Sequence, residues 1–216
     1  KNTSDSNSGV IENLCAIDTA LDTGGRNGLY YSRGSDNSAD DFTLCKASVP
    51  FSGLSFCCVS GRATDKYLPY YNLSGKTCGY TVAVGWTGNA KTDVNRADSG
   101  YELSAKQKNL SAYLLPGEEI RSVLVSVGFY DGDNPLKGFN LFRDWMLDCV
   151  LPEGSGCLNM LELAGPASVR TSDEIFDELA AVGDDVIAST DYFWMDAGWY
   201  MDTTQGEWSS AVGIWK

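Results

Sequence analysis

The chain has 216 residues, with 16 basic and 29 acidic side chains and no histidine, so its formal net charge is −13 at pH 7. This charge repels phosphate backbones and anionic membranes, and we expect neither nucleic acid nor a membrane as a partner. The absence of histidine excludes a Ser-His-Asp triad, a Cys-His dyad and a histidine-ligated zinc ion. Carboxylates remain as the main groups for proton transfer near neutral pH.

The seven cysteines contain no C-x-x-C pair, which argues against a thiolate zinc site or a thioredoxin-like motif. We predict no metal and no cofactor. Cys57 and Cys58 are adjacent in an apolar run and are expected to be small buried hydrophobes. The odd cysteine count favours the cytoplasm, whereas three Asn-x-Ser sequons, at Asn2, Asn72 and Asn109, favour secretion, so the localisation stays open. No apolar run is long enough for a transmembrane helix, and residues 1–9 lack a signal-peptide core.

Residues 1–137 are predicted to be mainly β. Runs of β-branched and aromatic residues alternate with Gly, Asn, Asp and Pro, most clearly at 54–59, 80–86, 110–115 and 120–129. In the last run Val123 and Val125 share one face, and the opposite face carries Ser122, Leu124 and Ser126. Short strands separated by turns favour an antiparallel β-sandwich.

Two helices are predicted next. Apolar residues at helical spacing predict a helix over 140–149, with Asn140 as its N-cap, Pro152 as its stop, and Phe142 and Trp145 buried against the sandwich. Thr171 and Glu174 form a capping-box pair before a second helix that Gly183 closes. The apolar stripe of this second helix consists of Ile175, Phe176, Leu179 and Val182.

A short apolar strand is predicted over 191–195, directly before Asp196. A helix followed by such a strand and a polar turn is typical of an α/β unit, in which ligand-binding groups follow the carboxyl ends of parallel strands. We therefore single out Asp196 as an acceptor for vicinal sugar hydroxyls and Trp199 as a ring that shapes the pocket. The alternative is that Asp196 caps a turn or helix and that Trp199 is a core residue.

Three other segments are interpreted as structural. Arg143 and Asp144 are expected on a solvated helical face, and Trp86 in the core at a strand end. Residues 131–134 begin like a calcium loop, but no glutamate follows at the required distance, so we predict a turn.

Eight segments, taken together and in order, resemble glycoside hydrolase family 36, the α-galactosidase and raffinose synthase group. They are spread along most of the chain: SGVIENLCAID (8–18), DDFTLCKASV (40–49), GRATDKYLPYYNL (61–73), VAVGWTGNA (82–90), LLPGEEIRSVLV (114–125), GFNLFRDWMLDCVLP (138–152), YFWMDAGWY (192–200) and VGIWK (212–216).

The resemblance implies an architecture. Residues 1–137 would be the C-terminal part of an N-terminal β-supersandwich, 138–190 a helical connection, and 191–216 the start of a truncated (β/α)8 barrel with 192–196 as its first strand. A complete barrel takes about 250 residues. The family's nucleophile and acid/base lie on later strands, so no catalytic residue is assigned within the chain. The chain alone is expected to be inactive, and its unpaired barrel strand favours a homo-oligomer.

Two positions depart from the family pattern. The family's strand-end motif is Asp-Asp-Gly-Trp; Asp196 matches its first residue, and Ala197 replaces the second. Galactose, a 2-amino or 2-acetamido galactose and another α-pyranoside are therefore all compatible ligands. Asn89 and Ala90 stand where many members carry Gln-Trp.

The implied function is that of a retaining glycoside hydrolase acting on terminal α-linked galactose or a related sugar in oligosaccharides. Such an enzyme uses two carboxylates about 5–5.5 Å apart and forms a covalent glycosyl intermediate. Asp196 and Trp199 would bind the galactoside or oligosaccharide substrate. Two alternatives remain: a non-catalytic carbohydrate-binding or structural β-sandwich protein, and a galactosyl-transferring, raffinose synthase-like enzyme.

Overall fold

The computed structural model describes residues 1–58, 64–85, 87–151, 160–161, 172–188, 190 and 192–193. The chain divides into two units, Lys1–Val150 and Leu151–Lys216, and each is described by itself. In the described ranges, no helix combines the length and apolar character needed to cross a membrane.

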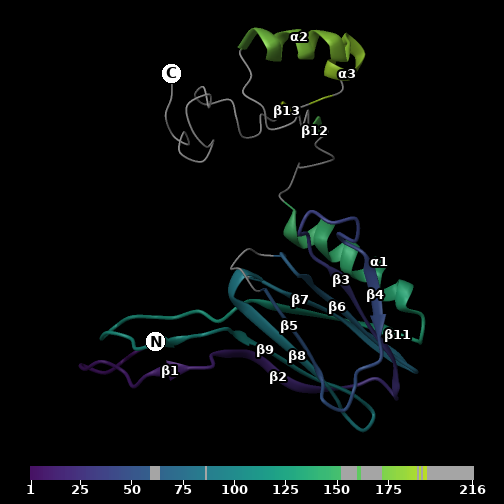
Figure 1. Ribbon diagram of the computed structural model, residues 1–216. Helices are drawn as coiled ribbons and strands as arrows, with labels where there is room; N and C mark the ends of the chain where they lie inside the picture. The colour runs from purple at the N-terminus through teal and green to yellow at the C-terminus, as the bar shows by residue number, and fades with distance from the viewer. Residues whose placement is uncertain are drawn as a thin grey trace. The chain divides into compact units, whose positions relative to one another are not determined.

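The first unit contains two large antiparallel sheets (Figure 1). The five-stranded sheet has the order β11-β7-β6-β3-β4, and the four-stranded sheet has the order β2-β9-β8-β5. Their strands are β2 (Cys15–Asp22), β3 (Arg26–Arg33), β4 (Leu44–Ala47), β5 (Leu54–Cys57), β6 (Tyr67–Gly75), β7 (Cys78–Val84), β8 (Ala90–Arg96), β9 (Gly100–Gln107) and β11 (Val125–Asp131). A third antiparallel sheet pairs β1 (Ile11–Glu12) with β10 (Ser111–Ala112). The predicted mainly β, antiparallel architecture is confirmed.

Alternation along the strands builds a core between the two large sheets. On β6, Tyr71 and Leu73 are buried in the core cluster, whereas Tyr70 and Asn72 alternate with them and lie toward the opposite face of the sheet. The fully buried core side chains include Leu29, Leu73, Val82, Val94, Tyr101 and Leu103. Burial of this apolar surface is the main stabilising term for a two-layer sheet structure.

The predicted strands differ in how well the structure reproduces them. Strands β5 and β7 occupy most of the runs 54–59 and 80–86, whereas the run 110–115 contains only the two-residue β10. The run 120–129 becomes a strand only from Val125. Its predicted facing is nevertheless confirmed, because Val123 is 2% exposed and Leu124 is 77% exposed.

The two adjacent cysteines lie in different environments. Cys58 is buried as predicted, and its Sγ accepts a hydrogen bond from the Thr64 amide at 3.3 Å. Cys57, at the end of β5, is only half-buried, so the expectation of burial is met by Cys58 and not fully by Cys57.

Helix α1 (Pro135–Trp145) begins five residues before the predicted N-cap at Asn140. The N-cap is Asn134, whose side-chain oxygen accepts a hydrogen bond from the Leu136 amide at 3.1 Å. Pro135 lies in the first turn of the helix. Backbone amides there have no intrahelical acceptor, so the lack of an N–H group in proline costs no hydrogen bond. In the predicted turn at 131–134, the chain bends at Gly132 and Asp133, between the end of β11 and the N-cap, with Gly132 at a φ of +85°. A π-helical turn, η2 (Met146–Val150), follows α1. Arg143 and Asp144 are exposed, as predicted.

Helix α1 packs on β11, β7 and β6 through a close approach at Gly138. A Cβ there would lie 2.6 Å from the Tyr130 ring and 2.7 Å from the Asn72 side chain. The Asn72 amide donates to the Pro135 carbonyl at 2.9 Å, and its oxygen accepts from the Tyr130 hydroxyl at 2.7 Å. Asn72 is 2% exposed, so its sequon is inaccessible in the folded unit.

Phe142 and Trp145 are half-buried, so their expected burial against the sandwich is only partial. The Phe142 ring packs on Tyr70 with ring centroids 4.8 Å apart, and on Trp145 at 5.7 Å. Helix α1 packs mainly on β6, β7 and β11, and it also reaches β3 through the contact between the Phe139 and Tyr30 rings.

The second unit contains β12 (Met160–Leu161), α2 (Ser172–Val182), α3 (Asp184–Ala188) and β13 (Tyr192–Phe193). The predicted second helix is confirmed, and it ends before Gly183, which has a φ of +91°. Thr171 and Pro152 lie outside the described residues. Strands β12 and β13 pair in parallel, with Met160 opposite Tyr192. Two parallel strands do not make a barrel, and the barrel start stays a prediction.

Candidate functional site

The two residues predicted to bind substrate, Asp196 and Trp199, lie outside the described residues, as do Trp86 and Ala197. The structure does describe β13, which ends at Phe193, shortly before Asp196 in the sequence. Since β13 runs parallel to β12, Asp196 follows the carboxyl end of a parallel strand along the chain. Asn89 and Ala90, the second departure from the family pattern, lie at a short 3-10 turn and at the start of β8, and Ala90 is buried.

Within the sandwich, a polar pocket of about 270 Å³ lies where β3 ends. We call it the loop pocket; it is lined by Tyr31, Arg33, Gly34, Asp36, Ser38, Asp40, Asp41, Asp65, Lys66 and Tyr67. Its residues come from the end of β3, from the β3–β4 loop, and from the segment that leads into β6. This pocket was not predicted from the sequence. A signal was present in the run GSDNSADD (34–41), which is rich in turn-forming and carboxylate residues.

Asp41 organises the β3–β4 loop. Its carboxylate accepts hydrogen bonds from the Ser35 hydroxyl at 2.6 Å, from the Asp36 amide at 3.1 Å, and from the amide and hydroxyl of Ser38 at 3.3 and 3.2 Å. The bond from Ser35 is the largest cause that lowers the pKa of Asp41 to about 2. The carboxylate of Asp41 is therefore occupied by its own loop.

Gly34 fastens this loop to the segment that precedes β6. Its amide donates to the Lys66 carbonyl at 2.9 Å, and the Ser35 amide donates to the Thr64 carbonyl at 2.8 Å. A Cβ at Gly34 would lie 1.9 Å from the Thr64 carbonyl oxygen, so only glycine permits this approach. The walls of the loop pocket are thus joined by backbone hydrogen bonds.

The pH dependence of this loop follows from the lowered pKa of Asp41. The folded pKa of about 2 lies below the ordinary aspartate value of about 3.9, so the stabilisation is complete above about pH 4 and is lost as the pH falls through about 2. We expect the amide NMR signals of Asp36 and Ser38 to titrate with a midpoint near pH 2. The Asp41→Asn variant should abolish that transition. A midpoint near the ordinary aspartate value in the wild type would contradict the hydrogen-bonding scheme.

The remaining groups of the loop pocket suit a polyhydroxylated ligand. Arg33 forms an exposed ion pair with Asp40 at 2.8 Å, and Lys66 lies over the Tyr67 ring at 5.5 Å. Exposed ion pairs of this kind contribute little to stability. Carboxylates accept hydrogen bonds from hydroxyls, cationic groups donate them, and tyrosine rings pack on apolar C–H faces. Of the residues that the structure describes, no His, Cys, Asp or Glu group is arranged to hold a metal ion.

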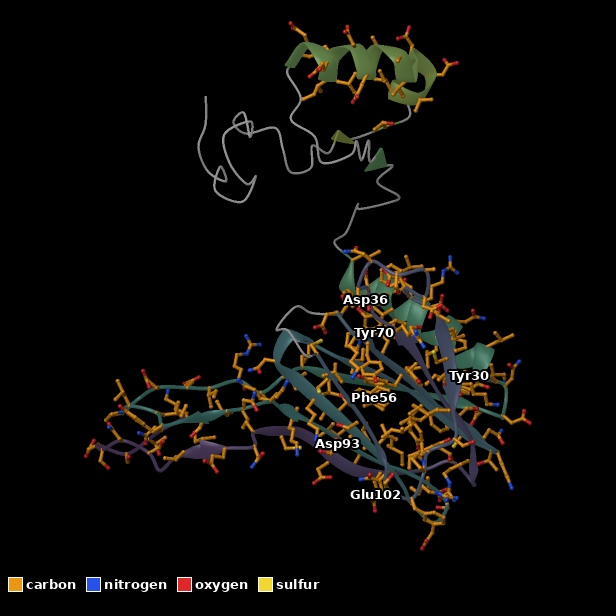
Figure 2. All side chains as sticks on the ribbon, viewed as in Figure 1. Tyr30, Asp36, Phe56, Tyr70, Asp93 and Glu102 are labelled. Carbon is orange, nitrogen blue, oxygen red and sulfur yellow. The ribbon has the colours of Figure 1, made fainter. Side chains whose placement is uncertain are left out.

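An aromatic groove of about 310 Å³ shares Tyr31 with the loop pocket. It lies between the outer face of the five-stranded sheet and α1, and its lining includes Tyr30, Leu44, Tyr70, Phe139 and Phe142. Tyr30 meets Phe139 edge-on with ring centroids 5.8 Å apart. Figure 2 labels Tyr30 and Tyr70 of this groove and Asp36 of the loop pocket. The sandwich therefore offers hydrogen-bonding groups and aromatic faces in two pockets that share a wall.

No protein-family model matches the chain, and a comparison with curated proteins finds no match. Neither comparison bears on the resemblance to glycoside hydrolase family 36.

Proposed function

We propose that the protein is part of a retaining glycoside hydrolase that acts on terminal α-linked galactose or a related sugar. The observation that carries the proposal is the strand–helix–strand unit β12-α2-α3-β13, whose two strands pair in parallel. In such units, ligand-binding side chains follow the carboxyl ends of the strands. The sequence Asp196-Ala197-Gly198-Trp199 follows β13 along the chain.

This unit also changes the expected numbering of the barrel strands. β12 precedes β13 in the chain and pairs with it, so we propose β12, in place of 192–196, as the first strand of the barrel. In the proposed barrel, β12 is the first strand and β13 the second. The mechanism assigns Asp196 to accept sugar hydroxyls and Trp199 to shape the pocket. The nucleophile and the acid/base belong to later barrel strands, and no cofactor takes part.

The second candidate function is non-catalytic carbohydrate binding by the sandwich. The loop pocket and the aromatic groove favour it, because carboxylates, cationic donors and tyrosine rings line these two neighbouring pockets. A galactosyl-transferring enzyme remains a variant of the first proposal, since only the acceptor changes from water to a sugar hydroxyl.

The experiment compares turnover with binding. We expect the longer protein implied by the resemblance to hydrolyse an aryl α-galactoside, with the α-anomer of galactose as the first product by NMR. Added raffinose-type acceptors distinguish transfer from hydrolysis. Absence of turnover, combined with galactose binding that Asp36→Asn weakens and the exposed control Asp18→Asn does not, would replace the hydrolase with the carbohydrate-binding module. Absence of both turnover and binding would overturn both proposals.

A further inference from the structure

A second polar cavity, of about 370 Å³, lies at the opposite end of β3 from the loop pocket. We call it the turn cavity; it is lined by Gly25, Arg26, Asn27, Gly28, Ser48, Val49, Lys76, Arg96, Asp98 and Tyr101. Arg26 begins β3, and Gly34 of the loop pocket follows its end. A strand of this length spans about 25 Å, so the two pockets are separate sites.

Three chain turns converge at the turn cavity: β2–β3, β6–β7 and β8–β9. The Thr23 amide donates to the Ser99 carbonyl at 3.0 Å, and the Lys76 amide donates to the Thr23 carbonyl at 3.0 Å. The Asn27 side-chain amide donates to the Gly75 carbonyl at 2.6 Å. These bonds tie the three turns together, so the cavity is formed by the fold before any ligand arrives.

The turn cavity is positively charged in a strongly acidic chain. Arg26, Lys76 and Arg96 contribute three positive charges and Asp98 one negative charge, whereas the whole chain carries −13. Within the described part of the chain, none of the three cations forms an ion pair with a carboxylate. Arg26 donates to the carbonyls of Ala97 and Gly100.

The other two cations keep donors for a ligand. The Arg96 guanidinium lies over the Phe51 ring at 4.3 Å, a contact that uses its face and leaves its edge N–H groups for hydrogen bonding. Lys76 is exposed and carries three donors on a flexible stem. An anion in this cavity therefore meets cationic donors from the end of β8 and from the β6–β7 turn.

We propose that the turn cavity binds a small organic molecule through a phosphate or sulfate ester. Guanidinium and ammonium groups form their strongest hydrogen bonds with such oxyanions, and arginine binds them in a bidentate manner. The volume falls within the range of about 300–1,000 Å³ that is typical of small-molecule pockets, which leaves space beyond the oxyanion for the body of the ligand. The local positive potential is needed because the rest of the chain repels anions.

The test is calorimetric titration of the chain at constant ionic strength. The probes are galactose 6-phosphate, galactose 6-sulfate, inorganic phosphate, inorganic sulfate and plain galactose. We expect at least one ester to bind, and to bind more tightly than its inorganic ion. Arg96→Gln and Lys76→Gln should each weaken that binding by about tenfold or more, because each removes charge-assisted hydrogen bonds. Arg121→Gln is the matched control, since it removes the same charge from an exposed position outside the cavity.

Three outcomes would overturn the proposal. They are no binding of any phosphate or sulfate probe, an equal loss of affinity in Arg121→Gln, and ester binding no tighter than that of the inorganic ion. Circular dichroism checks that the variants fold. If Arg96→Gln does not fold, Lys76→Gln alone tests the proposal, because the Lys76 side chain is exposed. The proposed glycosidase is tested separately, by turnover of an aryl α-galactoside, so failure here is distinguishable from failure of that proposal.

Discussion

Replacement of Asp196 by alanine is expected to lower kcat/KM for an α-galactoside by about a hundredfold or more in the longer enzyme. In the proposed function, the Asp196 carboxylate accepts hydrogen bonds from two sugar hydroxyls. Each charge-assisted bond contributes about 1.5–3 kcal/mol, and about 1.4 kcal/mol corresponds to a factor of ten in rate. The loss of both bonds therefore gives a hundredfold effect or more, measured by steady-state kinetics.

Two companion variants separate recognition from structure. Asp196→Asn keeps the shape of the side chain and removes its charge, so it should retain part of the lost activity. Ala197→Asp restores the second carboxylate of the family motif and should shift preference from 2-amino or 2-acetamido sugars toward plain galactosides. Full activity of Asp196→Ala with an unchanged KM would mean that this residue only caps a turn.

The second large effect is expected at Tyr101 in the core of the sandwich. This side chain is 0% exposed, and its hydroxyl donates to the Ser74 carbonyl at 2.7 Å and accepts from the Gly28 amide at 3.2 Å. Tyr101→Ala should lower the free energy of unfolding by about 3–5 kcal/mol, as truncation of a buried aromatic residue typically does. Urea denaturation monitored by circular dichroism measures it.

Tyr101→Phe isolates the contribution of the hydroxyl. This variant keeps the ring but removes the hydroxyl that bonds the Ser74 carbonyl and the Gly28 amide. The loss should lower the free energy of unfolding by about 1–3 kcal/mol. Tyr113→Ala is the control, because Tyr113 is 55% exposed and its replacement should change stability by less than about 0.5 kcal/mol. Equal effects of Tyr101→Ala and Tyr113→Ala would show that the described core is wrong.

Some features of this protein were determined by local sequence alone. The apolar stripe of α2 and Gly183 after it predicted that helix and its end, because period and capping act within a few residues. The alternation around Val123 and Leu124 predicted which face is buried for the same reason. The start of α1 was readable from Asn134 and Pro135, but the apolar spacing that begins later in the helix favoured Asn140.

Other strands left a weaker local pattern. β8 (AKTDVNR) and β9 (GYELSAKQ) bury one face and carry polar residues on the other, so they contain no apolar run. Their hydrophobic residues become a core only when the sheets are paired, since Val94 and Leu103 lie directly opposite each other across the β8–β9 pair. Sequence reasoning that looked for apolar runs therefore passed over them.

The absence of histidine excluded histidine-based catalysis and a histidine-ligated zinc ion, and the sequence motifs predicted Asp196 and Trp199 as binding residues. Only the tertiary structure placed the loop pocket and the turn cavity. Arg26 begins β3, Lys76 lies in the β6–β7 turn and Arg96 ends β8, and no local pattern connects them. They come together because antiparallel pairing returns successive strand ends to the same end of the sandwich. This long-range geometry depends on strand order and register, which follow from burial over the whole unit and not from any single segment.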